Sequence, residues 1–129
     1  MIVLDTSVII AVACNEAHKK KLVKIAFGQE LIAPQSVRWE IGNAFSSMLR
    51  RRMITLNSAL SAIKICFSIP VRYTEVELDE CLKLSSEFNI YAYDAYILRC
   101  AVKYRSPLLS LDKGLLKTAS EKGIQILEV

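Results

Sequence analysis

The sequence predicts an α/β sandwich with a largely parallel sheet. Short aliphatic runs alternate along the chain with longer stretches of helical periodicity, as in folds where helices connect parallel strands. Hydrophobic residues make up 53% of the 129 residues, enough for a full core. No internal repeat and no Pro- or Gly-rich linker divides the chain. We therefore expect one domain spanning residues 1–129.

The first half of the chain predicts two strands and four helices. Gly28 ends the second helix, Pro34 closes the second strand, and Ser36 is placed to cap the long third helix. The fourth helix carries its apolar residues on one expected stripe of Leu56, Ala59, Leu60, Ile63 and Phe67. In order, the elements are a strand at 1–4, a helix from there to residue 14, a helix at 16–27, a strand at 31–33, and helices at 36–51 and 56–67.

The second half predicts three strands and three helices, with Pro70 and Pro107 preceding two of the strands. In order, these are a strand at 71–73, a helix at 76–88, a helix at 93–104, a strand at 108–111, a helix at 113–122 and a strand at 124–127. The helix at 76–88 is expected to bury Leu78, Cys81, Leu82 and either Ser85 or Phe88. In parallel sheets of this kind, ligands bind beyond the carboxyl ends of the strands.

Composition excludes several classes of protein. The apolar N-terminus is interrupted by Asp5 and is followed, not preceded, by lysines, unlike a signal peptide. No window approaches the roughly 20 apolar residues of a membrane span, so we expect no membrane partner and a cytoplasmic location. The four cysteines are far apart and the only histidine is His18. We expect the cysteines to be small buried residues, and neither a zinc site nor a Ser-His-Asp triad is predicted.

The formal net charge of +4 is unevenly placed, with lysines at 19–21 and 24 and arginines at 50–52. Such runs are either solvated helix faces or contacts for a polyanion, and charge alone leaves both open.

Four carboxylates stand where apolar residues are expected. Asp5 and Asp112 each follow an aliphatic strand, so both would open into one crevice if those strands are adjacent. Glu40 shares the apolar stripe of its helix, and Asp94 lies in register with the apolar residues that follow it. Each has a structural explanation: helix caps for Asp5 and Asp112, a helix-dipole charge for Asp94, and pairing with Arg38 or Lys64 for Glu40.

Taken together, the four acids predict a site for hard divalent cations, which take oxygen ligands. Such a site suits phosphodiester hydrolysis, because a bound metal acidifies water and stabilises the leaving oxygen.

Four stretches, in order, carry a family resemblance: IVLDTSVIIA, WEIGNAF, YDAYILRCA and LLSLDKGLLKTA. The chain resembles a PIN-domain ribonuclease of the VapC toxin type over nearly its whole length. The resemblance implies a parallel five-stranded sheet in the order 3-2-1-4-5 with helices on both faces. It also implies an Mg²⁺- or Mn²⁺-dependent endoribonuclease that acts on RNA, forms a homodimer and is silenced by a cognate antitoxin.

The family's acidic set falls on Asp5, Glu40, Asp94 and Asp112, as catalytic and metal-binding residues. Thr6 and Ser7 match the hydroxyl positions after the first acid. Asn43 and Ser110 match polar neighbours that would orient the acids, with Ser110 replacing the commoner Thr. The resemblance leaves open whether Glu40 binds metal through water or acts as the base on the attacking water.

Other functions fit the sequence less well. A haloacid-dehalogenase phosphatase needs a second acid two residues after the first, where Ser7 stands, and a receiver domain needs an acidic neighbour that Asp5 lacks. A non-catalytic PIN-like module that binds RNA or protein is the remaining alternative, although all four acids are present. Tyr91, Tyr93 and Tyr96 flank Asp94 and either stack bases or pack in the core or in a dimer.

Overall fold

Five parallel strands form a single sheet in the order β3-β2-β1-β4-β5, as the sequence predicted. The computed structural model describes residues 1–129. The strands are β1 (Ile2–Leu4), β2 (Leu31–Pro34), β3 (Val71–Thr74), β4 (Leu108–Leu109) and β5 (Ile126–Leu127). In the central strand, Val3 pairs with Ile32 of β2 on one side and with Leu108 of β4 on the other. This arrangement brings the carboxyl ends of β1 and β4 side by side.

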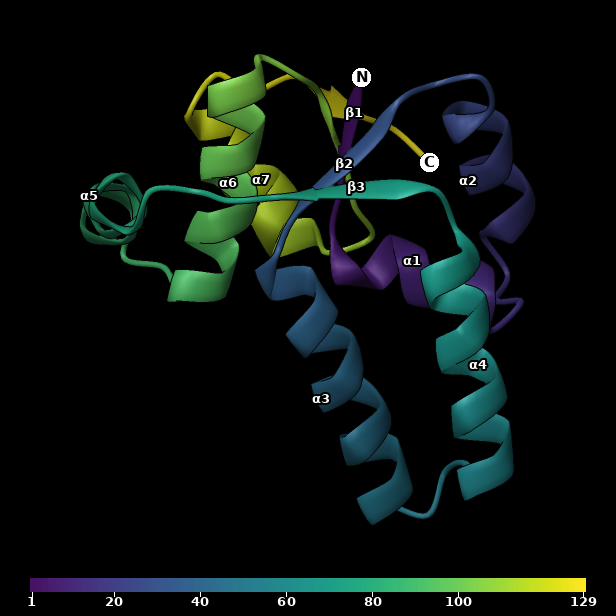
Figure 1. The fold of residues 1–129 in the computed structure, drawn as a ribbon. Coiled ribbons are helices and arrows are strands. Elements are labelled where there is room, and N and C mark those ends of the chain that lie inside the picture. Colours follow the sequence, from purple (N-terminus) through teal and green to yellow (C-terminus); the bar gives the residue numbers. More distant parts are fainter.

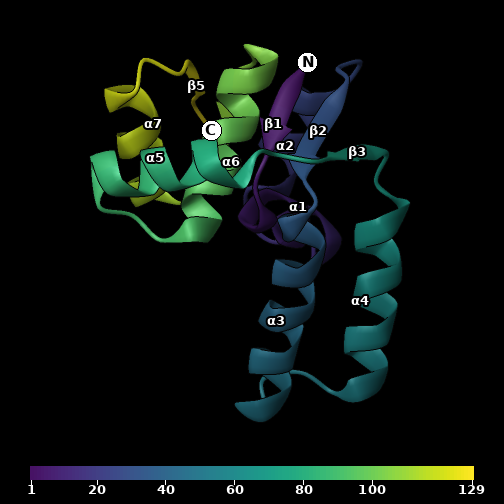
Figure 2. The same ribbon diagram turned by 60° about the vertical axis from the view of Figure 1, so that its left-hand side comes forward.

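Seven helices connect and cover the strands (Figure 1). They are α1 (Thr6–Ala13), α2 (Lys19–Ala26), α3 (Ser36–Arg50), α4 (Leu56–Ser68), α5 (Leu78–Phe88), α6 (Ala92–Tyr104) and α7 (Lys113–Glu121). On one side of the sheet α1 packs against α2, α3 and α4, and on the other α5 packs against α6. The pair α3 and α4 extends well beyond the end of the sheet, as both views of the ribbon show (Figures 1 and 2).

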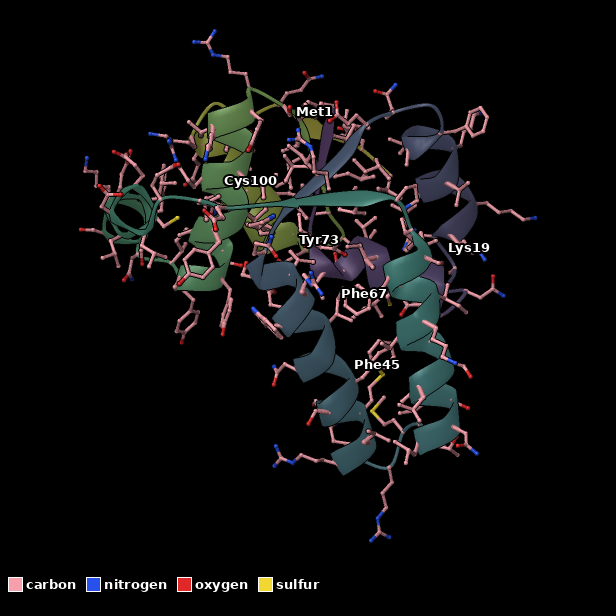
Figure 3. All side chains as sticks on the ribbon, viewed as in Figure 1. Met1, Lys19, Phe45, Phe67, Tyr73 and Cys100 are labelled. Carbon is pink, nitrogen blue, oxygen red and sulfur yellow. The ribbon has the colours of Figure 1, made fainter.

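One continuous cluster of buried apolar residues joins the sheet to the helices. All three residues of β1 are buried, as expected for the central strand of a parallel sheet covered on both faces. Phe45, only 1% exposed, fills the space between α3 and α4 (Figure 3). Cys66, Cys81 and Cys100 are buried, as predicted, whereas Cys14 is only half-buried; all four are free thiols. No helix in the chain is both long enough and apolar enough to cross a bilayer.

Two helix starts differ from the sequence prediction. Ser36 is the first residue of α3 and not its cap, because Gln35 already has helical backbone angles (φ −53°, ψ −30°) and makes no capping side-chain bond. The helix expected from residue 16 begins only at Lys19, after a turn in which Asn15 takes a left-handed backbone conformation (φ 56°).

The apolar stripe expected on α4 is only partly buried, and the buried face expected on α5 is partly wrong, although Cys81 is buried as expected. In α4 the buried residues are Ala59, Ala62 and Cys66, whereas Leu56, Leu60 and Phe67 are exposed. Small side chains face inward because α4 lies directly against α1. In α5, Leu78 and Leu82 are about two-thirds exposed (64% and 65%), and α6 instead covers the stripe that contains Cys81 and Leu84. Both helices therefore carry large apolar residues on their outer faces.

Candidate active site

Asp5 lies at the junction of β1 and α1, and its carboxylate is fixed from three directions. Its Oδ1 accepts a hydrogen bond from Ser7 Oγ at 2.6 Å and another from the backbone N–H of Val8 at 3.3 Å. Its Oδ2 accepts from Ser110 Oγ at 2.6 Å. The side chain is only 6% exposed. Asp5 is thus the N-cap of α1, the structural role foreseen for it, and also an acid held at the end of the central strand.

Two serines join the ends of β1 and β4. Ser110 Oγ, besides donating to Asp5, accepts from the backbone N–H of Asp112 at 2.9 Å. Ser7 Oγ, besides donating to Asp5, accepts from the backbone N–H of Leu111 at 3.0 Å. Each hydroxyl therefore links Asp5 to the segment that carries Asp112. This explains why hydroxyl residues at these two positions stabilise the arrangement.

Asp112 follows β4 and caps α7, since its Oδ1 accepts from the backbone N–H of Leu115 at 3.1 Å. Unlike Asp5, it is an exposed residue.

Asp94 is half-buried in the first turn of α6. Burial, and next the negative charge of Asp112, raise the pKa of Asp94 above its ordinary value. Because the charge of Asp112 acts on Asp94, the two side chains lie in one electrostatic neighbourhood.

Glu40 projects from α3 toward the start of α1. Its Oε2 accepts from Thr6 Oγ1 at 3.2 Å, whereas its Oε1 is buried and has no hydrogen-bond partner. Burial raises the pKa of Glu40 to about 7 against the lowering effect of the Thr6 hydrogen bond, and the charges of Asp5 and Asp94 add to the increase. A buried carboxylate oxygen without a hydrogen-bond partner costs free energy in a folded protein. Oε1 of Glu40 is therefore an acceptor that a ligand could satisfy.

Burial also raises the pKa of Asp5, although the hydrogen bonds from Ser110, Ser7 and Val8 oppose it; the charge of Asp112 is a smaller raising cause. None of the four acids forms a salt bridge with lysine or arginine, so the proposed pairing of Glu40 with Arg38 or Lys64 is wrong. Asn43 is exposed and makes no side-chain hydrogen bond to the acids. The site is therefore a group of carboxylates that no cation of the chain neutralises.

The chemistry of this group fits a hard divalent cation. All four side chains offer oxygen donors, which Mg²⁺ and Mn²⁺ take in proteins, and Glu40 Oε1 has no other partner. As placed here, however, no three acidic, histidine or cysteine side chains lie close enough together to enclose an ion.

The model of the PIN domain family matches residues 2–121. The chain belongs to the PIN-domain family. This confirms the resemblance drawn from the four sequence stretches, and the strand order 3-2-1-4-5 expected from it is the observed one. No protein matched in the comparison with curated sequences.

Several solved structures share this PIN fold over nearly the whole chain. PAE2754 from Pyrobaculum aerophilum is 25% identical, with a TM-score of 0.74 over 97% of this chain and 82% of that one. VapC20 from Mycobacterium tuberculosis, a toxin that cleaves the sarcin-ricin loop, is 19% identical (TM-score 0.67, covering 100% and 98%). VapBC2 from Rickettsia felis, solved with a DNA fragment from its promoter, is 13% identical (TM-score 0.67, covering 98% of each). At these low identities the last two show the fold alone.

One neighbour of the acids was not foreseen from the sequence. Trp39, the only tryptophan of the chain, precedes Glu40 on α3, is 73% exposed, and lines a pocket between α3, α6 and the segment that leads into α5. The sequence signal for Trp39 is its position directly before Glu40, a candidate site acid. The tyrosines around Asp94 are the aromatic residues for which the sequence suggests base stacking.

Proposed function

We propose that this PIN domain, acting as a single unit over residues 1–129, is a divalent-metal-dependent endoribonuclease and the toxin of a VapBC-type pair. The proposal is supported by four carboxylates without a basic partner, located at the ends of β1 and β4 and near the N-terminal ends of α3 and α6, where the charges of some raise the pKa values of others. The substrate is RNA, and the expected site of action is the cytoplasm.

Asp5, Asp94 and Asp112 would hold Mg²⁺ or Mn²⁺, with Glu40 at the edge of the same group. Such an ion supplies Lewis-acid stabilisation of phosphate charge and lowers the pKa of a nearby water. Asp5 contributes a fixed orientation, because hydrogen bonds to both of its oxygens prevent rotation of the carboxylate. Asp112 is positioned by Ser110 through its backbone and by its capping bond to α7.

Glu40 is the residue best suited to take a proton from the attacking water. Its raised pKa, about 7, is close to the value at which a general base works best at neutral pH. Thr6 holds Oε2, which leaves Oε1 as the atom that accepts the proton. Thr6, Ser7 and Ser110 therefore act as positioning residues for Glu40 and Asp5. Asn43 remains a proposed member of this group, on the same face of α3 as Glu40.

The test is cleavage of a mixed RNA preparation by the purified protein in Mn²⁺, in Mg²⁺ and in chelator. Cleavage is expected with either metal, and none in chelator or in the Asp94→Asn variant. Asp79→Asn is the matched control, since Asp79 is the one aspartate outside the group and is exposed at the start of α5. RNA binding without cleavage by the wild-type protein would instead indicate a non-catalytic PIN module.

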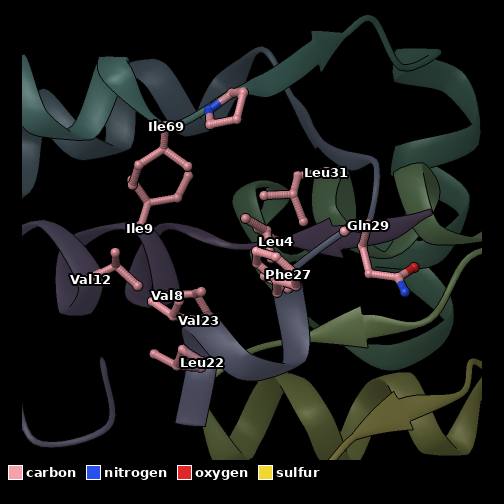
Figure 4. A pocket seen from close by; sticks show the side chains of 13 residues that line it. Leu4, Val8, Ile9, Val12, Leu22, Val23, Phe27, Gln29, Leu31 and Ile69 are labelled. Atoms are coloured by element: carbon pink, nitrogen blue, oxygen red, sulfur yellow. The ribbon is translucent and has the colours of Figure 1, made fainter. Parts of the chain in front are cut away.

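An antitoxin partner is supported by an apolar cavity of about 290 Å³ between α1, α2, β2 and the end of α4 (Figure 4). Aliphatic side chains line most of it, and Phe27 at its rim is 84% exposed. Four lysines of α2 flank it: Lys19, Lys20, Lys21 and Lys24. We propose that an antitoxin segment with apolar and acidic residues covers this cavity, while an arginine or lysine of the antitoxin reaches the carboxylates.

Co-expression with the protein encoded by the adjacent gene is expected to yield a stable complex. A Val12→Asp substitution, which places a charge in the cavity, is expected to abolish that complex without preventing RNA cleavage. If no neighbouring product binds and expression of the chain alone does not harm its host, the toxin assignment fails, whether or not the protein cleaves RNA.

A further inference from the structure

A second pocket, separate from the apolar cavity, lies beside α3 and α6, the two helices that carry Glu40 and Asp94. It measures about 350 Å³, within the range of small-ligand sites, and lies between α3, the segment after β3, and α6. We call it the Trp39 pocket. Its lining includes Gln35, Ser36, Trp39, Glu75, Leu78 and Tyr96.

The pocket offers flat aromatic surfaces. The Trp39 ring is 73% exposed. Tyr96 is held edge-on by Tyr93, with ring centroids 5.8 Å apart and an interplanar angle of 87°. Single-stranded RNA is recognised largely by stacking unpaired bases on such rings, because every base has a flat apolar face. An exposed tryptophan beside a half-buried tyrosine is thus a suitable surface for one base.

Two polar groups of the pocket have no partner within the protein. Ser36 Oγ is buried and makes no hydrogen bond. The carboxylate of Glu75 takes part in no salt bridge. Carboxylates accept hydrogen bonds from the amino group of cytosine, so this pair of groups fits the polar edge of a base. A lone acid repels phosphate, which excludes the RNA backbone as the occupant of this pocket.

The wall that carries Glu75 is held in place. Lys103 Nζ donates to the backbone oxygen of Glu75 at 3.1 Å and to the Glu77 carboxylate at 2.7 Å, and Arg99 contacts the same carboxylate at 2.9 Å. The entrance to α5 is therefore fixed to α6. Preorganised walls reduce the entropy that a ligand must lose on binding.

The pocket and the carboxylates share two helices. Ser36 and Glu40 are four residues apart on α3, so they lie on one face a single turn apart. On α6, Tyr96 and Asp94 are two residues apart and therefore point to different sides of the helix. The pocket is thus connected to the carboxylates through α3, where a nucleotide held against Ser36 would lie one helical turn from Glu40.

We propose that the Trp39 pocket binds one unpaired base of the RNA substrate, stacked on Trp39 and Tyr96, with Glu75 favouring a base that carries an exocyclic amino group, such as cytosine, over uracil. This inference rests on the proposed ribonuclease function. It assigns to the pocket the choice of base beside the cleaved bond.

Trp39 is the only tryptophan, so its fluorescence reports on the pocket without any cleavage. In chelator, titration with a cytidine hexanucleotide is expected to quench the fluorescence at lower concentration than a uridine hexanucleotide does. Glu75→Gln is expected to remove the difference between the two. Glu80→Gln, on the outer part of α5, is the control and is expected to leave the difference unchanged.

Cleavage gives the second measurement. Trp39→Ala is expected to lower kcat/KM on single-stranded RNA by about 5- to 150-fold, the effect of losing one base stack, mainly through KM. Trp39→Phe is expected to restore most of it, because a ring remains. Met53→Ala, which changes an exposed apolar residue between α3 and α4, is expected to have no effect.

The outcomes separate this inference from the function on which it rests. Quenching by the cytidine hexanucleotide without any RNA cleavage would support base binding in the Trp39 pocket and contradict the proposed ribonuclease function. Cleavage that Trp39→Ala does not change, or fluorescence indifferent to both hexanucleotides, would overturn the pocket. A Trp39→Ala protein that binds RNA normally but no longer dimerises or binds the antitoxin would assign Trp39 to a protein interface. That result would also contradict base binding in the Trp39 pocket.

Discussion

Asp5 combines two roles that the sequence presented as alternatives. The carboxylate caps α1 through Val8 and is at the same time held by Ser7 and Ser110 at the end of the central strand. A capping bond uses one lone pair of Oδ1, and the carboxylate has several more acceptor sites. A structural explanation for a single acid therefore does not argue against its membership of a site.

Ser110 is expected to stabilise this arrangement through its two hydrogen bonds. Ser110→Ala removes the donor to Asp5 Oδ2 and the acceptor for the Asp112 N–H, both in a buried place. We expect it to lower the free energy of unfolding by about 1–3 kcal/mol, the cost of leaving buried polar groups unpaired. Urea unfolding measures this. Ser120→Ala, at an exposed position of α7, is the control and is expected to change little; equal effects of the two substitutions would contradict the role assigned to Ser110.

The raised pKa of Glu40 makes the stability of the metal-free protein depend on pH. Its pKa rises from 4.5 in the unfolded reference to about 7 in the folded chain, so folding favours its protonated form. The resulting penalty is absent below about pH 4.5, grows between that value and pH 7, and is complete above it. Asp5 and Asp94, whose pKa values are also raised, act in the same direction.

The free energy of unfolding in chelator should therefore decrease as pH rises from 5 toward 8, and Glu40→Gln should make this decrease smaller. Urea unfolding at several pH values measures both. Glu121→Gln, at an exposed position of α7, is the control and should follow the wild type. A wild-type protein whose stability increases steadily over that range would contradict the burial assigned to Glu40.

At the scale of single elements, α4 depends on small residues where it meets α1. Ala59 is 2% exposed on that face. Ala59→Leu is expected to destabilise the protein by about 1–3 kcal/mol, because the added atoms must push the two helices apart. Lys64→Ala, at an exposed position of α4, should change stability by no more than about 0.5 kcal/mol. Thermal or urea unfolding of the two variants distinguishes the faces; a large loss with Lys64→Ala would reverse the assignment.

The outer faces of α4 and α5 are the expected interface of a twofold dimer. They carry large exposed apolar residues, including Leu60 (52% exposed) and Leu82 (65% exposed). We expect sedimentation at about 30 µM to give a dimer, since even a micromolar affinity would populate it. Leu60→Glu or Leu82→Glu should give folded monomers, because each places a charge on an apolar contact. A monomeric wild-type protein at that concentration would count against the dimer.

At the scale of the whole molecule, an ion bound at the proposed site should stabilise the fold as a unit, because it would bind the folded chain and not the unfolded one. Mn²⁺ is expected to raise the melting temperature of the wild type, and to raise that of Asp94→Asn less. In chelator, Asp94→Asn should melt at the same temperature or higher, since one of several repelling charges is gone. Scanning calorimetry in both conditions, with Asp79→Asn as control, measures this. An Asp94→Asn protein that melts lower in chelator and still cleaves RNA would contradict the metal site.

The sequence predicted the strands and their approximate limits, because short aliphatic runs are local signals; the site formed by the four acids stays a prediction. The buried face of α5 was predicted only in part, because apolar residues occur on more than one side of this helix and only the neighbouring α6 decides which side is buried. The bond from the Leu111 N–H to Ser7 Oγ and the unpartnered Oε1 of Glu40 could not be foreseen either. Both depend on side-chain placement across strands and helices that are distant in the chain.

The central place of β1 has a consequence for synthesis of the protein. Val3 is made more than a hundred residues before Leu108, with which it pairs in the neighbouring strand β4. Sheets that wait for such distant partners fold late, and the nascent chain meanwhile exposes apolar strand edges that chaperones bind. Asp94 and Asp112 likewise follow Asp5 by many residues, so the proposed site cannot be complete before Asp112 has been made. A ribosome would thus carry an incomplete form of that site while it translates everything between Asp5 and Asp112.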